Sequence, residues 1–390
     1  MTDRAVDVLL IGGGVASVRC ARALRRLGFD GSVLLVGEER RAPYNRPPLT
    51  KELIRGEVPE ELVAAEPVAW YARRSIELAT ETRVTSLDPE ARRVALAGGG
   101  VIRFTRCLLA TGAAPRRLLT PGGAGTALLR TMDDALAIRA AAAGARHAVV
   151  IGGGFLGVEL AASLAASGTR VTVLELTPQL WAGALGPELT EWGRRTLGAE
   201  GVAVRLGVSA TAIESDAVLI GPERLEADLV VVSVGVEPRV ELAAGAGIAC
   251  GDGVLTDASQ ATGAAGVWAA GDVARVAGRR VEHWHAAREG GERAAAAMLG
   301  LPVPAARPPW VYTEFAGQLL DVIGSAAANA DRAMLGDEAA GQFAVAWVED
   351  GAVTQVAIAN GWLPVEEVRS ALERGLSMDE LRLIPARRDP

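Results

Sequence analysis

The sequence predicts an α/β fold built from two similar βαβ halves, followed by a smaller α+β segment at the C-terminal end. Three observations lead to this prediction. A glycine-rich turn joins a β-branched strand to a small-residue helix twice, in residues 6–38 and 147–175. Further apolar strands cover 106–112 and 267–273, which suits a mainly parallel core. Beyond residue 309 the pattern changes to hairpin strands and two short helices.

Composition limits the class of protein. A chain of 390 residues, half of them hydrophobic, is long enough for two or three domains. Its net charge of −7 argues against a nucleic-acid binder that works by general attraction to phosphate. The three cysteines, Cys20, Cys107 and Cys250, are far apart and form neither a CxxC motif nor a disulfide framework. We therefore expect a reducing, cytoplasmic setting.

We expect neither membrane insertion nor a metal site. The charged N-terminus leads directly into a strand, which leaves no room for a signal peptide. The long apolar stretch at 148–166 is interrupted by Glu159. His283 and His285 flank Trp284 without an accompanying cysteine or carboxylate pattern, which makes a poor metal site.

The first half, VDVLLIGGGVASVRCARALRRLGFDGSVLLVGE, has the spacing of a dinucleotide-binding motif. Gly12 allows a tight turn, and Gly14 lets the backbone approach a pyrophosphate. The N-terminus of the following helix offers free N–H groups to that anion. Ser17 occupies the third glycine position and is small enough for close packing. Glu38, at the end of the second strand, can accept hydrogen bonds from a ribose diol.

The second half, HAVVIGGGFLGVELAASLAASGTRVTVLE, repeats the pattern with Gly152, Gly154 and Gly157. Its terminal acid is Glu175. A carboxylate at this position repels a 2′-phosphate, and residues 176–179 supply no arginine to bind one. The sequence therefore favours NADH over NADPH.

Together these features resemble the FAD-dependent pyridine-nucleotide oxidoreductases, which are glutathione-reductase-like proteins. The family carries an FAD motif, an ATG segment (here 110–112), an NAD motif and a late GD segment (here 271–272), in that order. The likeness covers roughly residues 5–325 and implies an NAD domain inserted within an FAD domain. The expected domains are 1–112 and 239–309 for FAD, 113–238 for NAD, and 310–390 for an α+β C-terminal domain. Taken alone, Asp272 is also consistent with a turn residue or a helix N-cap.

Three segments resemble the ferredoxin-reductase branch, which includes the putidaredoxin, rhodocoxin and dioxygenase ferredoxin reductases. They are PYNRPPLTKEL (43–53), GVEPRVELAAGAGI (235–248) and RVEHWHAAREGGERAAAAMLG (280–300). Disulfide reductases of the superfamily carry a redox-active cysteine pair near residues 40–55, whereas this chain has no cysteine there. The resemblance implies that electrons pass from NADH through FAD to a small iron–sulfur ferredoxin without a protein thiol.

Lys51 is the only lysine among 40 basic side chains, and the other 39 are arginine. By resemblance it matches a lysine whose ammonium lies near flavin N5 and pairs with the glutamate of the second motif helix, here Glu159. Both are predicted to be catalytic. An ammonium is a compact donor that a broad guanidinium does not replace. The alternative for Lys51 is an ordinary surface lysine. The alternative for Glu159 is an acid that is stabilised only by the dipole at the N-terminus of its helix.

The resemblance also implies contacts to each cofactor. Expected FAD contacts come from Gly12, Gly14, Val15, Ala16, Glu38, Arg46, Pro47, Lys51, Val84, Ala110, Thr111, Gly112, Arg130, Gly271, Asp272 and Trp284. Expected NAD contacts come from Gly152, Gly154, Phe155, Leu156, Glu159, Glu175 and Gly235. Phe155 falls where a side chain gates the nicotinamide pocket.

The C-terminal segment departs from the branch, because VYTEF places Tyr312 where a tryptophan is expected over the flavin. This departure leaves the electron acceptor open. Two alternatives to a ferredoxin reductase stay open. One is an NADH oxidase or quinone reductase, and the other is an NADH-sensing flavoprotein of the apoptosis-inducing-factor kind. An acidic ferredoxin would need a local basic patch on this chain. Each arginine pair is a candidate for that patch, and the alternative is that the pair is only solvated surface. The candidate pairs are Arg73-Arg74, Arg92-Arg93, Arg116-Arg117 and Arg279-Arg280. We expect a monomer or weak dimer.

Overall fold

The computed structural model describes residues 3–181 and 185–386. The described chain divides into two compact units. Unit 1 comprises Met1–Asn45, Glu60–Ala114 and Val236–Ala306, and unit 2 comprises Arg46–Pro59, Pro115–Gly235 and Arg307–Pro390. The segment Arg46–Pro59, which contains Lys51, groups with unit 2. The domain boundaries expected from the sequence stay a prediction.

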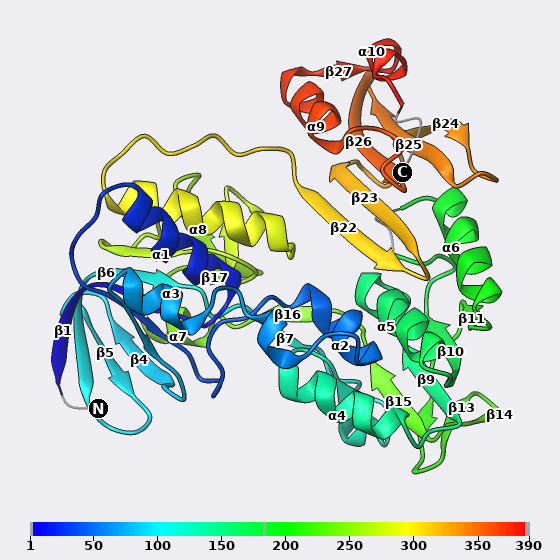
Figure 1. Ribbon diagram of the computed structural model, residues 1–390, viewed down its shortest axis with the longest axis horizontal. Helices are drawn as coiled ribbons and strands as arrows, with labels where there is room; N and C mark the ends of the chain where they lie inside the picture. The colour runs from blue at the N-terminus through cyan, green and yellow to red at the C-terminus, as the bar shows by residue number, and fades with distance from the viewer. Residues whose placement is uncertain (1–2, 182–184, 387–390) are drawn as a thin grey trace. The chain divides into compact units, whose positions relative to one another are not determined.

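The main sheet of unit 1 is parallel at its centre. Its strands are β1 (Arg4–Ile11), β2 (Val33–Val36), β3 (Ile76–Ala79), β4 (Val84–Asp88), β5 (Arg93–Leu96), β6 (Val101–Leu109) and β19 (Val267–Ala269). They are ordered β3-β2-β1-β6-β5-β4, with β19 also beside β6; Figure 1 labels β1, β4, β5 and β6 of this sheet. Strands β1, β2, β3, β6 and β19 pair in parallel, and β4 and β5 extend the sheet antiparallel. The carboxyl ends of β1, β6 and β19 therefore meet at one edge.

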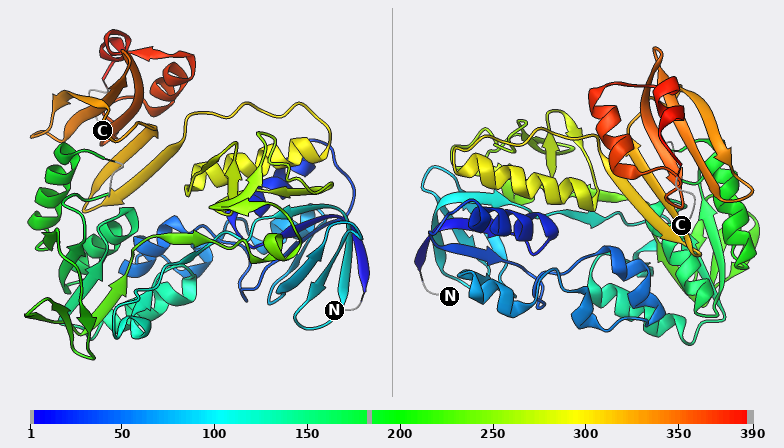
Figure 2. Two further views of the ribbon diagram at one scale, coloured as in Figure 1. Left: turned by 180° about the vertical axis from the view of Figure 1, so that it is seen from behind. Right: turned by 45° about the horizontal axis from the view of Figure 1, so that its top comes forward.

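Two helices of unit 1 pack closely beside this sheet. Helix α1 (Val15–Arg26) begins directly after the first glycine turn, and α8 (Trp284–Met298) lies alongside it (Figures 1 and 2). A Cβ added at Gly291 would lie 2.2 Å from the carbonyl oxygen of Ala16, so the two backbones meet at a glycine. The unit also contains the 3₁₀ turn η2 (Glu60–Val63), α3 (Val68–Arg73), β7 (Ala113–Pro115, which ends at the boundary with unit 2), β16 (Val236–Pro238), α7 (Glu241–Gly245), β17 (Cys250–Gly251), β18 (Gly253–Thr256), β20 (Ala274–Val276) and β21 (Arg279–Arg280).

Unit 2 contains a second parallel sheet of the same kind. Its strands are β8 (Ala127–Leu128), β9 (His147–Ile151), β10 (Arg170–Glu175), β11 (Ala203–Leu206) and β15 (Leu229–Val232), ordered β11-β10-β9-β15-β8. Helix α5 (Phe155–Ala166) follows the second glycine turn. Other elements are α4 (Met132–Ala142), α6 (Pro187–Ala199), β12 (Ala212–Ile213), β13 (Ala217–Ile220) and β14 (Glu223–Glu226).

The C-terminal part of unit 2 is an antiparallel sheet covered by helices. Its strands are β22 (Trp310–Phe315), β23 (Gln318–Gly324), β24 (Asp331–Asp337), β25 (Gln342–Glu349), β26 (Ala352–Ala359) and β27 (Leu376–Ser377). Helices α9 (Val365–Arg374) and α10 (Met378–Leu383) join its core through Val368 and Leu381 (Figure 2). Strand β24, with the polar sequence DRAMLGD, was not predicted, because it lacks a hydrophobic alternation.

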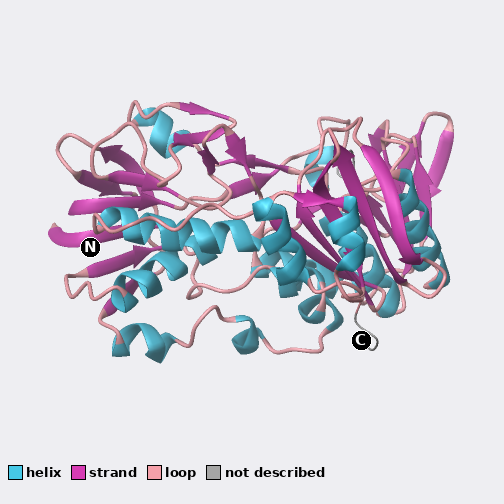
Figure 3. Ribbon diagram, turned by 90° about the horizontal axis from the view of Figure 1, so that it is seen from above, coloured by secondary structure: helices cyan, strands magenta, loops and turns pink. Residues whose placement is uncertain are grey.

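Three segments of unit 2 that are distant in sequence lie together. Helix α5 contacts the short 3₁₀ turn η1 (Pro47–Thr50), helix α2 (Glu52–Arg55) and strand β22. Figure 3 shows the helices and strands of the described chain coloured by type. The predicted α/β class, with two Rossmann-like folds and a C-terminal α+β part, is confirmed.

Candidate active site

Both glycine turns are as tight as the sequence predicts. Gly12 and Gly152 have φ of +118° and +113°, a region that side-chain-bearing residues rarely adopt. A Cβ at Gly12 would lie 2.1 Å from the Ala110 carbonyl oxygen, and one at Gly152 would lie 2.1 Å from that of Ser233. Each turn therefore brings the end of the first strand against the strand beside it, where only hydrogen fits.

The helices after these turns present an anion cradle. Gly14 and Gly154 are the N-caps of α1 and α5, and neither helix has a side-chain cap or an acidic residue in its first turn. A Cβ at either glycine would meet nothing within 4 Å. The space and the N–H groups fit the pyrophosphate of a dinucleotide. In this respect the residues present suit FAD and NAD(H).

The two strand-end acids have different surroundings. Glu175 is buried, and its Oε2 accepts from Gly153 N at 2.6 Å while its Oε1 accepts from Thr177 N at 2.8 Å. Glu38 is more exposed and pairs with the guanidinium of Arg239. Sequence reasoning missed Arg239, although it lies within the segment 235–248 used for the resemblance.

Arg239 also joins the end of β6. Its backbone N donates to the carbonyl oxygen of Gly112 at 3.0 Å, and its own carbonyl oxygen accepts from Thr111 Oγ1 at 2.8 Å. The predicted residues Thr111 and Gly112 are thus held next to Glu38 through Arg239.

Several other expected FAD residues of unit 1 lie in or beside α1, whereas Val84 lies on the end strand of the sheet. Val15 and Ala16 form its first turn, and a Cβ at Gly271 would lie 3.3 Å from Ala16 Cβ. The late GD segment therefore lies against the first motif helix, and Asp272 follows directly. Trp284 begins α8, and its Nε1 donates to Asn45 Oδ1 at 3.2 Å. Val84, the first residue of β4, is partly exposed.

The remaining predicted residues belong to unit 2. The Arg46 guanidinium donates to the carbonyl oxygen of Arg130, so the structure brings these two together, and Pro47 opens η1. On the NAD side, Phe155 contacts the ring of Trp181 at a centroid distance of 6.4 Å. Two further residues have expected NAD contacts. Leu156 is 43% exposed. The carbonyl oxygen of Gly235 accepts a hydrogen bond from Arg116 N at 2.9 Å.

The Lys51 ammonium and the Glu159 carboxylate form a buried ion pair, with Lys51 Nζ 3.2 Å from Glu159 Oε1. Two hydroxyl groups also bind this carboxylate. Thr313 Oγ1 donates to Oε1 at 2.8 Å, and Thr50 Oγ1 donates to Oε2 at 2.5 Å. The Tyr312 ring lies 5.6 Å from Lys51 Nζ. The predicted pair is present, and the two threonines were missed.

Tyr312 stays a neutral phenol beside this cluster. Burial raises the pKa of its hydroxyl group above the ordinary value of about 10, and the negative charge of Glu159 raises it further. Lys51 therefore faces an uncharged aromatic ring, to which a cation is attracted.

The cysteines offer no reactive thiol at this site. Cys20 and Cys107 are fully buried, and burial raises the pKa of both thiols. Cys250 is half-buried, and its thiol pKa is raised for the same reason. Within residues 3–181 and 185–386 no group of His, Cys, Asp and Glu side chains is arranged to hold a metal ion. In the same residues, every helix is too short or too polar to cross a bilayer.

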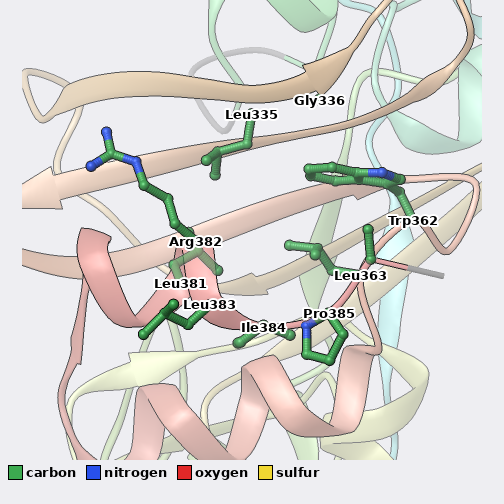
Figure 4. A pocket seen from close by; sticks show the side chains of 10 residues that line it. Leu335, Gly336, Trp362, Leu363, Leu381, Arg382, Leu383, Ile384 and Pro385 are labelled. Atoms are coloured by element: carbon green, nitrogen blue, oxygen red, sulfur yellow. The ribbon is translucent and has the colours of Figure 1, made fainter.

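A separate pocket of about 280 Å³ lies in the C-terminal part (Figure 4). Leu335 and Trp362 line it together with Leu381 and Ile384. Among the described residues that line it, the one charged side chain is Arg382, which pairs with an aspartate one helical turn earlier, at 3.1 Å. The pocket thus brings no catalytic group of its own.

The sequence model of the pyridine nucleotide-disulphide oxidoreductases matches residues 6–291. The chain belongs to this family. It is an oxidoreductase whose cofactors are FAD and NAD(H). The matched range contains both glycine turns, the strand-end acids and the Lys51–Glu159 pair.

Relatives within the family are similar over most of their length. The ferredoxin–NAD(+) reductase component of the biphenyl dioxygenase system of Paraburkholderia xenovorans is 38% identical over 86% of this chain and 85% of its own. The rubredoxin–NAD(+) reductase of Pseudomonas putida is 32% identical over 82% of this chain and 86% of its own. Among solved structures, the covalent putidaredoxin reductase–putidaredoxin complex gives a TM-score of 0.89 at 29% identity, covering 94% of this chain and 93% of that one.

Proposed function

We propose that this protein is an NADH-dependent flavoprotein reductase that passes electrons from NADH through its FAD cofactor to a small iron–sulfur ferredoxin of a monooxygenase or dioxygenase system. The observation that carries the proposal is the buried Lys51–Glu159 pair, in a chain with two dinucleotide cradles and no accessible thiol at the pair. Relatives named as ferredoxin–NAD(+) reductases support the same reading.

In this proposal each Rossmann-like fold binds one dinucleotide. The first-turn N–H groups of α1 receive the pyrophosphate of FAD, and those of α5 receive that of NADH. Glu38 and Glu175 accept hydrogen bonds from the adenosine riboses. Glu175 is already held by Gly153 and Thr177, so a 2′-phosphate would meet a fixed negative charge.

Lys51 acts beside the reacting groups. When bound, FAD accepts a hydride from NADH and releases electrons one at a time. Lys51 supplies a positive charge and hydrogen-bond donors there, and Glu159 holds the ammonium in place. Most of the rate gain comes from orientation, which contributes several kcal/mol when reactants are held in register, on the order of 7–11 kcal/mol at the upper limit.

The partner surface needs local positive charge on a protein whose net charge is −7. In two of the predicted arginine pairs, one arginine already forms a salt bridge within the protein. Arg93 lies 3.2 Å from Asp88, and Arg280 lies 3.0 Å from Asp252. Arg73 and Arg117 are exposed and make no ion pair within the described residues. Arg73 belongs to unit 1 and Arg117 to unit 2, and we propose each separately as a candidate contact for an acidic ferredoxin.

The test is an anaerobic titration of the purified holoprotein with NADH, followed by addition of acceptors. The flavin spectrum should bleach with NADH and recover when a [2Fe–2S] ferredoxin is added. Recovery only with rubredoxin would identify that protein as the partner, and recovery only with a quinone or oxygen would identify a small-molecule reductase. A flavin that NADH does not reduce on a catalytic time scale would contradict the proposal.

Location and assembly are part of the same proposal. We infer a cytoplasmic protein, supported by buried free cysteines that suit a reducing compartment. We also infer a monomer or weak dimer. Sedimentation at micromolar concentration tests the assembly state.

A further inference from the structure

The carboxylate of Glu159 is held by three side chains from two separate segments. Lys51 and Thr50 come from the chain around η1, and Thr313 comes from the middle of strand β22. All four residues are buried, with whole-residue exposed fractions of 0% for Thr313, 2% for Thr50, 4% for Lys51 and 6% for Glu159. A carboxylate in such a place needs its oxygens occupied.

The two hydroxyl groups fix different oxygens. Thr50 Oγ1 also lies 3.2 Å from the Pro47 carbonyl oxygen, but a hydroxyl has one proton, and the 2.5 Å contact to Glu159 Oε2 is the shorter. Thr313 donates to Oε1, the oxygen that also faces Lys51 Nζ. With one donor on each oxygen, the carboxylate plane is fixed and Oε1 is aimed at the ammonium.

We propose that Thr50 and Thr313 are positioning residues, which hold Glu159 in the one orientation that places the Lys51 ammonium for reaction. Through the Thr313 hydroxyl group, strand β22 of the C-terminal sheet contributes a hydrogen bond to the Lys51–Glu159 pair. The arrangement of hydroxyl groups is independent of the reaction, whereas its consequence for the rate rests on the proposed function.

A single lysine gives a direct probe of this arrangement. Because Lys51 is the only lysine in the chain, labelling with nitrogen-15 lysine yields one side-chain ammonium signal. Exchange of its protons with water reports on burial and hydrogen bonding, and needs no NADH. The test compares holoprotein with Thr313→Val, which keeps the shape and removes the hydroxyl, and with Thr313→Ser, which keeps the hydroxyl.

In Thr313→Val we expect the ammonium signal to shift, its protons to exchange faster, and flavin reduction by NADH to slow about tenfold, equivalent to about 1.4 kcal/mol. The Kd for NADH should change less than about twofold, because a positioning residue acts on the reacting geometry rather than on uniform binding. Thr313→Ser should restore both the signal and the rate. An unchanged signal in Thr313→Val overturns the proposal, as does an altered signal with an unchanged reduction rate.

Two controls separate positioning from general damage. Thr190→Val removes another buried hydroxyl of unit 2, whose Oγ1 donates to the Gly186 carbonyl oxygen, and should leave the lysine signal and the rate as in wild type. In a Lys51→Met background, Thr313→Val should slow reduction little further, because its effect acts through Lys51. Equal slowing in both backgrounds overturns the proposal.

Thr50→Val provides a second route if Thr313→Val does not fold, since it removes the other donor from a different segment. The same signal and rate changes are expected. If wild-type protein is not reduced by NADH at all, the proposed function fails, while the ammonium signals still decide whether the hydroxyl groups hold the pair.

Discussion

Lys51 Nζ lies 3.2 Å from Glu159 Oε1, and the two side chains are only 5% and 8% exposed. Removing two charges from water costs several kcal/mol per ion, and a hydrophobic pair of similar size is often at least as stable. A buried pair of this kind is therefore poorly explained by stability alone. Its place between η1, α5 and β22, in a chain that otherwise uses arginine, is explained by a need for an ammonium at this point.

Replacing the ammonium should slow flavin reduction without removing FAD. We expect Lys51→Arg to bind FAD normally and to be reduced by NADH roughly ten- to a hundredfold more slowly, about 1.4 to 2.7 kcal/mol in the transition state. Lys51→Met and Glu159→Gln should each be harmful, and the double variant less harmful than the sum. Stopped-flow reduction of all four proteins is the measurement. Wild-type speed in Lys51→Arg would show that the lone lysine has no special role.

Glu175 should set the preference for NADH. We expect kcat/KM for NADH to exceed that for NADPH at least tenfold, about 1.4 kcal/mol or more. Glu175→Gln keeps the size and removes the charge, so it should narrow the ratio. Glu175→Ala also leaves the N–H groups of Gly153 and Thr177 without their acceptor, and should in addition lower stability by about 1–3 kcal/mol.

The ratio of the two cofactors is the decisive quantity for Glu175. A loss of activity that is equal with NADH and NADPH would mean that the acid only supports the turn. An unmodified protein that uses both cofactors equally well would contradict ribose recognition by this residue.

The sequence was most informative where chemistry leaves little choice. Positive φ and backbone contact force glycine at Gly12 and Gly152, so the two folds and their turns were predictable. The Ser-x-x-Glu spacing of Ser377 and Glu380 is the sequence pattern of a capping box, and this box is present at the start of α10. Each of these features depends on residues close together in the chain.

The missed residues depend on contacts between distant segments. Thr50 and Thr313 are ordinary residues in the sequence, and only the packing of η1 and β22 against α5 turns their hydroxyl groups toward Glu159. Arg239 likewise meets Glu38 from another part of the chain. The sequence offered one indication of their role, which is their position. Thr50 directly precedes the single lysine, Lys51, and Thr313 directly follows Tyr312, which stands where a tryptophan is expected.

His147 should make the second Rossmann-like fold sensitive to mild acid. Arg170 donates to its Nδ1 at 3.1 Å, so the proton is on Nε2, which donates to Thr172 Oγ1 at 2.9 Å. Burial, reinforced by the charge of Arg170, lowers the pKa of this imidazole below 6.5. The unfolded chain therefore takes up a proton that the folded chain resists, and stability falls as pH drops below about 6.5.

The comparison is with His147→Gln, which can accept from Arg170 and donate to Thr172 without titrating. Between pH 7.5 and 5.5 the free energy of unfolding should fall more steeply in wild type, by up to about 1.4 kcal/mol per pH unit. Denaturant unfolding at several pH values measures both slopes. Parallel slopes would show that His147 titrates alike in the folded and unfolded states.

Gly12 and Gly14 should respond differently to alanine. Gly12→Ala forces a side chain into φ of +118° and against the Ala110 carbonyl, which should cost at least about 1–3 kcal/mol of stability. Gly14→Ala meets nothing in the protein, so the stability of the apoprotein should change by less than about 1 kcal/mol. Its methyl group nevertheless occupies the cradle, and FAD uptake should weaken about tenfold or more, about 1.4 kcal/mol. Fluorescence titration of apoprotein with FAD decides, and wild-type affinity in Gly14→Ala would place the pyrophosphate elsewhere.

Gly154→Ala tests which dinucleotide each half binds. Its backbone is as unhindered as that of Gly14, so the protein should fold and take up FAD like wild type, and should remain yellow. The added methyl group lies at the N-cap of α5, where we place the pyrophosphate of NADH, so the Kd for NADH should rise about tenfold or more, about 1.4 kcal/mol. Flavin content and NADH titration of Gly14→Ala and Gly154→Ala side by side measure both effects. The reverse pattern, with FAD lost from Gly154→Ala and retained in Gly14→Ala, would exchange the two assignments, because each methyl group reports only on the nucleotide that approaches its own helix.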